Sequence, residues 1–130
     1  MKTFPPSEAP VEVAAAMSGD MLFSISPATK STPHASAASR TVTIALVNAA
    51  GDVCTWFNKA ITAGVSIGHS GASGTATIAS TVLTFVNGVA TVVITIGGTW
   101  AGADSDTLTI AAAIIMGYTV AQVTSVETFT

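Results

Sequence analysis

The strongest constraint on the fold is a change of pattern at Arg40, after which the chain contains no proline and alternates apolar with small polar residues. In the run TVTIALV (41–47), valine, isoleucine and leucine fall on one side of an extended chain, and threonine and alanine fall on the other. Similar short runs recur to the C-terminus, separated by turn signals such as NAAGD and GGTWAGADSD. This spacing predicts about seven or eight strands packed as an all-β sandwich.

The stretch LTFVNGVATVVITI (83–96) predicts a β-hairpin with a two-residue turn at Asn87-Gly88. A type I′ turn there would pair Val86 with Val89 and would continue the ladder through residues 83–85 and 90–92. The predicted core face consists of Leu83, Phe85, Ala90, Val92 and Ile94. The opposite face consists of Val82, Thr84, Val86, Val89, Thr91, Val93 and Thr95. That second face is too apolar for a freely solvated surface, and its mixed character predicts partial cover by another segment or subunit.

Residues 1–38 differ from the rest of the chain, because all five prolines lie within them. Proline removes a backbone donor and is excluded from central strands. We therefore predict an extended N-terminal arm or a set of edge segments over 1–38, with MLFSI (21–25) the one plausible short strand. The segment VEVAAAM (11–17) fits a helical turn or a strand equally well. Residues 39–130 are predicted to form the sandwich domain.

The composition excludes several classes of function. Charged residues make up 8% of the chain, against roughly 25% in ordinary soluble domains. The four Lys and Arg residues are scattered, which argues against nucleic-acid binding. No run approaches the ~18 apolar residues of a membrane span, and the start, MKTFPPSEAP, lacks the apolar core of a secretory signal. A surface of Thr, Ser, Ala and Gly suits a protein packed against other subunits or a neutral soluble domain, and composition alone leaves both open.

Residues capable of chemistry are few and do not converge in sequence. His34 and His69 have no second ligand at metal-binding spacing. Cys54 lies in a strand-like run and is predicted to be a small buried hydrophobe. Asp104 and Asp106 in the loop GADSD offer fewer oxygens than calcium requires, and we predict that they solvate the loop. The sequence therefore predicts no catalytic residue, no cofactor and no metal.

The two tryptophans receive opposite predictions. Trp56 lies in the strand-like run VCTWFN and is expected in the core. Trp100 lies in a loop of Gly, Ala and Thr, which makes it the better candidate for an exposed contact residue.

The segments GDVCTWFNKAITAGVSI, GTATIASTVLTFVNGVATVVIT and DTLTI, followed by GYTV and SVETFT, resemble bacterial immunoglobulin-like domains of tailed-phage virion proteins. The resemblance covers about residues 40–130 and does not reach the N-terminal arm. It implies an immunoglobulin-like sandwich and a structural, non-enzymatic protein without a cofactor. It also implies assembly into the virion inside the host bacterium, without a signal peptide.

Within that group, one such domain with an N-terminal arm most resembles a capsid decoration (cement) protein. The implied partners are the major capsid protein or other virion subunits, and a homo-oligomer, a trimer above all. The residues expected to make assembly contacts are Phe4, Pro5, Pro6, Lys30, Thr84 and Thr91. A tail or head–tail joining subunit is the alternative within the virion. A module that binds carbohydrate or the cell surface through Trp100 is the alternative outside it.

Overall fold

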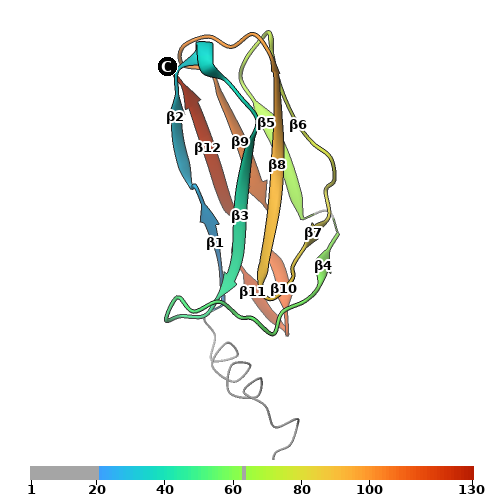
Figure 1. Ribbon diagram of the computed structural model, residues 1–130. Coiled ribbons are helices and arrows are strands. Elements are labelled where there is room, and N and C mark those ends of the chain that lie inside the picture. The colour runs from blue at the N-terminus through green and yellow to red at the C-terminus, as the bar shows by residue number, and fades with distance from the viewer. Residues whose placement is uncertain (1–20, 63) are drawn as a thin grey trace, which may run out of the picture.

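A computed structural model describes residues 21–62 and 64–130, and this part of the chain is all-β. Two four-stranded sheets face each other as a sandwich, with the C-terminus at one end (Figure 1). The predicted all-β sandwich is thus confirmed. No helix in the described ranges is long and apolar enough to cross a membrane.

The first sheet has the strand order β1-β3-β8-β6 and is antiparallel throughout. Its strands are β1 (Leu22–Ser26), β3 (Arg40–Val47), β8 (Val89–Gly98) and β6 (Gly74–Ile78). Alternate residues of β3 are buried, as the period of two predicts, and Val42, Ile44 and Leu46 have no exposed surface.

The second sheet has the order β2-β12-β9-β5, in which β2 runs parallel to β12 and the other neighbours are antiparallel. Its strands are β2 (Thr29–Thr32), β12 (Val123–Phe129), β9 (Ser105–Ile110) and β5 (Val65–His69). In β9 the inward residues are Asp106, Leu108 and Ile110. The core between the sheets is therefore apolar toward one end and carries a carboxyl group toward the other.

The chain passes from the first sheet to the second within residues 22–32. β1 pairs with β3, the Ser26–Pro27 peptide bond is cis, and β2 then pairs with β12. Phe23 stacks on Phe85 in the core, with ring centroids 5.9 Å apart. The boundary predicted at residue 38 is therefore wrong, because residues 21–32 complete an edge of each sheet. The segment 1–20 lies outside the described residues.

Two smaller ladders and one helical turn complete the chain. β4 (Ala60–Ile61) pairs with β7 (Leu83–Thr84), and β10 (Ala113–Ile115) forms a hairpin with β11 (Tyr118–Val120). A 3₁₀ turn, η1 (His34–Ser36), links β2 to β3.

The Asn87-Gly88 turn forms as predicted, but the hairpin beyond it does not. Both turn residues have positive φ, 51° and 80°, and Val86 bridges Val89. The backbone N–H and C=O of Phe85 bond to Lys59 and are unavailable to Ala90, so the predicted ladder ends after one bridge. The predicted core face is nevertheless confirmed, since all five of its residues are buried.

Candidate functional site

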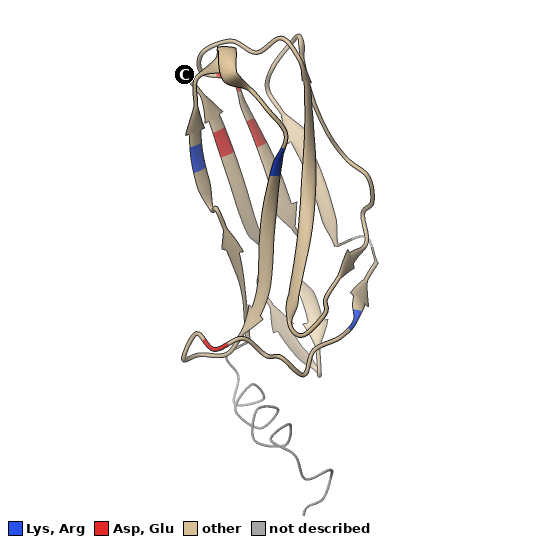
Figure 2. Ribbon diagram, viewed as in Figure 1, with Lys and Arg blue, Asp and Glu red and all other residues tan. Residues whose placement is uncertain are grey.

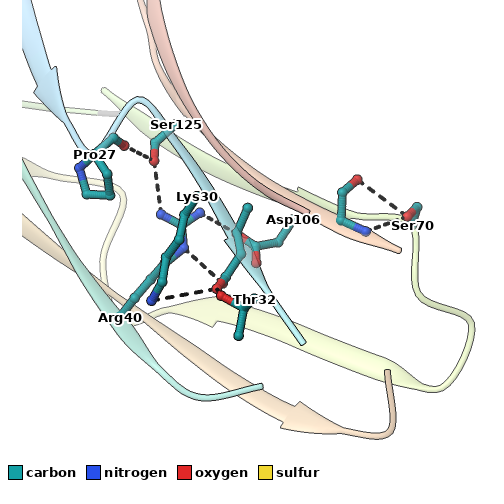
Figure 3. Close-up of polar contacts among 9 residues, drawn as sticks. Pro27, Lys30, Thr32, Arg40, Ser70, Asp106 and Ser125 are labelled. Carbon is teal, nitrogen blue, oxygen red and sulfur yellow. Dashed lines mark hydrogen bonds and ion pairs between the residues drawn. The ribbon is translucent and has the colours of Figure 1, made fainter. Parts of the chain in front are cut away.

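The most concentrated polar chemistry in the described structure is a buried ion cluster of Arg40, Asp106 and Glu127. Arg40 begins β3 in the first sheet, and its side chain reaches the two carboxyl groups on β9 and β12 of the second sheet (Figure 3). Its Nη2 donates to Asp106 Oδ1 at 2.5 Å and its Nε donates to Glu127 Oε1 at 3.2 Å. The side chains of Arg40, Asp106 and Glu127 are 3%, 0% and 0% exposed. The cluster therefore ties the two sheets together across the sandwich.

Neutral groups and one further cation complete the cluster. Arg40 Nη1 donates to Ser125 Oγ at 2.9 Å, and that hydroxyl donates to the Pro27 carbonyl oxygen at 2.5 Å. The Thr32 hydroxyl donates to Glu127 Oε2 at 2.6 Å. Lys30 Nζ lies 3.7 Å from the same oxygen with its side chain 43% exposed, so the cluster reaches solvent at the edge strand β2. The Pro27 crossover and the strand β2 that follows it are thereby fixed to the cluster.

The electrostatics of the cluster centre on Asp106. Burial raises the pKa of this carboxyl group, its interactions with Arg40 lower that pKa, and the neighbouring Glu127 raises it again. Asp106 Oδ2 is buried and has no hydrogen-bond partner among the described residues. The prediction that Asp106 solvates a loop is wrong, because it occupies an inward position of β9. Asp104 does lie in the loop, where its Oδ2 accepts from the Ala101 N–H at 2.9 Å.

Trp100 is buried, with 3% exposure, and the prediction of an exposed contact residue is wrong. Its ring lies 4.5 Å from that of Phe129, centroid to centroid, and its Nε1–H donates to the Gly97 carbonyl oxygen at 3.0 Å. A Cβ atom at Gly74 would lie 2.5 Å from the indole, and one at Gly71 would lie 2.9 Å from it. Gly71 and Gly74 therefore leave room for the Trp100 ring, which packs directly on their backbone.

Trp56 was expected in the core and is only partly buried there, edge-on to Phe57. It lines a groove of about 490 Å³ at the end of the sandwich that holds β4 and the β10–β11 hairpin. Ile114 and Met116 line the same groove and are 76% and 46% exposed. Lys59 is the charged residue on the groove wall.

The outer face of the first sheet carries no charged side chain among the described residues. It includes the exposed β8 residues of the predicted mixed Thr/Val face, together with residues of β1 and threonines of β3 and β6. Its outward, exposed members are Leu22, Ser24, Ser26, Thr41, Thr43, Thr75, Thr77, Thr91, Val93 and Thr95. We call this surface the neutral face. Leu22 and Val93 are 51% and 54% exposed, so the neutral face also carries apolar surface.

Charge is confined elsewhere on the described molecule (Figure 2). Lys30 lies on the edge strand β2, and Asp52 and Lys59 lie in loops and are exposed. The outward residues of the second sheet are also uncharged. They include Ser66, Thr107, Thr109, Thr124, Val126 and Thr128.

Thr84 and Thr91, two of the predicted assembly residues, lie on different sheets of the described structure. Thr91 lies on the neutral face and pairs with Thr43, whereas Thr84 lies on β7 and pairs with Ala60. Both threonines are exposed, but the predicted pairing of one with the other is wrong. Phe4, Pro5 and Pro6 lie outside the described residues.

The chain has two histidines, His34 and His69, and one cysteine, Cys54. Cys54 is buried, as predicted. The His34 Nδ1 is 2.7 Å from the Thr130 carbonyl oxygen, and the His69 ring lies edge-on to Trp100. Within 21–62 and 64–130, no group of three His, Cys, Asp or Glu side chains could hold a metal ion.

No protein-family model matches the sequence, and no curated protein matches it significantly.

Proposed function

We propose that this chain is a structural subunit of a phage virion, with an immunoglobulin-like sandwich, and that it decorates the outside of the capsid. The neutral face is the observation that carries the proposal. Depletion of charge is the compositional signal of the buried part of a protein interface. Leu22 and Val93 add apolar area in the same surface.

The edge of the neutral face supports contact with other subunits as well. β6 is an edge strand of the first sheet, and its sequence, GTATI, contains neither charge nor proline. Edge strands of free proteins are commonly protected by charged side chains, proline or bulges. A partner subunit covering this region would remove the need for such protection.

The proposed attachment combines the neutral face with residues 1–20. Met21 precedes β1, which is the other edge strand of the same sheet, so the chain enters the domain beside the neutral face. The proposed partners are the major capsid protein and further copies of this chain, with three copies around one site favoured. A tail or head–tail joining subunit would use the same features, and the binding experiment separates the two roles. The buried position of Trp100 leaves the carbohydrate-binding alternative without its contact residue.

The experiment is co-sedimentation of the full chain with purified capsids that lack it, and separately with purified tails. Saturable binding to capsids is expected. Binding to tails alone would assign the tail role, and binding to neither would refute the virion proposal. A deletion of residues 1–20 tests their part, because a longer deletion to residue 38 would also remove β1 and β2 and so disrupt both sheets.

Two matched variants test the neutral face itself. Thr91→Lys places a charge in the middle of the neutral face, and Thr124→Lys places one on the outer face of the second sheet. We expect Thr91→Lys to lower capsid binding at least tenfold, with Thr124→Lys unchanged and both proteins folded. Equal binding by both variants would show that the neutral face is not the contact.

A further inference from the structure

The buried ion cluster contains more buried carboxyl groups than buried cations. Asp106 and Glu127 are fully buried, and the guanidinium of Arg40 is the buried cation that faces both. Lys30 compensates only from the rim, since its side chain is 43% exposed and its ammonium group is 3.7 Å from Glu127 alone. Two ionised carboxylates would therefore share one buried positive charge.

The hydrogen bonds distinguish the two carboxyl groups. Glu127 accepts at both oxygens, at Oε1 from Arg40 and at Oε2 from Thr32. Asp106 accepts at Oδ1 from Arg40, and its Oδ2 is buried without a donor among the described residues. An ionised oxygen in that position would lose its hydration without replacement. A protonated Oδ2 would instead be a hydrogen-bond donor beside Glu127, whose two oxygens act as acceptors.

We propose that Asp106 holds a proton in the folded protein at neutral pH and shares it with Glu127, so that the buried ion cluster is a proton-binding site joining the two sheets. One proton accounts for both the partnerless oxygen and the excess of carboxyl groups. Loss of the proton would place a second negative charge beside Glu127, on the inner face of the second sheet. Release of this proton would thus weaken the tie between the sheets.

The surrounding charges agree with this assignment. Arg40 contacts Asp106 from β3. Glu127 on β12 and His69 on β5 are its register neighbours, and Asp104 precedes it in the loop. Burial and the Glu127 carboxyl group raise the pKa of Asp106 against the lowering effect of Arg40.

A raised pKa fixes the sign of the pH dependence. The stability that Asp106 contributes is fully present below the unfolded value of 3.8 and is lost as the pH rises through its folded pKa. The sandwich should therefore lose stability as the pH rises from the unfolded value of 3.8 through the folded pKa of Asp106.

The test is the urea midpoint of the full chain between about pH 5 and about pH 9, compared with that of Asp106→Asn. Asparagine keeps one acceptor for Arg40 and supplies an N–H donor in place of the proton. We expect the wild-type midpoint to fall with rising pH and the Asp106→Asn midpoint to lie at or above it, with that slope abolished. Asp52→Asn removes an exposed carboxyl group and should retain the wild-type slope.

A direct measurement keeps the proposal testable if the variant does not fold. The side-chain carboxyl ¹³C resonance of Asp106 in the wild-type chain should stay at its protonated position through neutral pH. Titration of that resonance at about pH 4, as for an ordinary aspartate, would overturn the proposal. So would an Asp106→Asn midpoint lower than the wild type at every pH with the slope unchanged.

Discussion

Replacing Arg40 with methionine should be among the most damaging single changes in the described structure. Methionine preserves much of the apolar length of the side chain but removes the guanidinium that contacts Asp106, Glu127 and Ser125. Hydrogen bonds to charged groups contribute about 1.5–3 kcal/mol each, and a buried carboxylate would be left without its cation. Breaking a buried ion pair by removing one partner costs about 3–5 kcal/mol, and we expect a loss in that range.

A loss of about 3–5 kcal/mol is a large fraction of the free energy of unfolding of the whole domain. A domain of this size has a free energy of unfolding of about 5–15 kcal/mol, and the urea dependence of small proteins is about 1–3 kcal/mol per molar. The urea midpoint, followed by tryptophan fluorescence, should therefore fall by about 2 M. Lys30→Met is the matched control, because it removes a half-exposed cation from the same cluster and should cost no more than about 1 kcal/mol.

A combined variant separates loss of the cation from loss of packing. Arg40→Met with Asp106→Asn and Glu127→Gln leaves no buried charge behind, and it should be more stable than Arg40→Met alone. A single Arg40→Met variant that loses less than about 1 kcal/mol would refute the reasoning, since the cluster would then not be what holds the sheets together. If the combined variant were no more stable than Arg40→Met alone, the damage could not be attributed to the unpaired buried carboxyl groups.

Three further changes test other parts of the fold. Trp100→Ala should lower the free energy of unfolding by about 3–5 kcal/mol in the same urea assay, because the indole is buried, and a loss below 1 kcal/mol would contradict its place in the core. Gly88→Ala should lower the free energy of unfolding by more than the roughly 1–2 kcal/mol that a positive φ costs a residue with a side chain. The reason is that the added Cβ would lie 2.5 Å from the Cys54 carbonyl oxygen. Gly51→Ala, at a similar φ but with no atom within 4 Å, should cost only the conformational part, so equal losses would be inconsistent with the close contact. Thr91→Lys should change the free energy of unfolding by no more than about 0.5 kcal/mol, as measured by urea unfolding, and a larger loss would mean that its effect on capsid binding comes from unfolding.

The sequence predicts the core well because the period of a strand is a local property. Residues two apart face the same side whatever strand lies beside them, so the buried positions of β3 and the core face of 83–94 follow from alternation alone. Pairing is not local. Phe85 bonds to Lys59 rather than to Ala90, because the pairing of β4 with β7 brings Lys59, the residue before β4, opposite its backbone groups.

The misplaced boundary of the sandwich has a similar cause. Pro27 and Pro33 suggested an extended arm, yet both lie just outside strands, at the crossover between β1 and β2 and at the start of η1. Proline excludes the interior of a central strand and leaves short edge strands on either side possible. Proline content therefore identified the ends of two edge strands and not the absence of strands.

The buried ion cluster was missed although the sequence carries a signal for it. Arg40 is in phase with the apolar residues of β3, Asp106 is in phase with Leu108 and Ile110, and Glu127 is in phase with Phe129. Three charged residues of both signs, each in phase with the apolar residues of its strand, would have suggested mutual pairing, because an isolated buried charge is too costly. The proximity of the three side chains, and the buried Asp106 Oδ2 without a hydrogen-bond partner, could be found only from the three-dimensional structure.

The position of the charges connects the stability of the domain with its proposed role. A protein free in solution usually keeps charged side chains on its surface, where they oppose association. Here Arg40, Asp106 and Glu127 are inside, while the outward side chains of both sheets are neutral among the described residues. Interior charge fixes how the two sheets align and leaves their outer surfaces free of repulsion toward a partner. A protein that functions in an assembled shell benefits from both properties, and Thr91→Lys would restore to the neutral face the charge that a free protein would carry there.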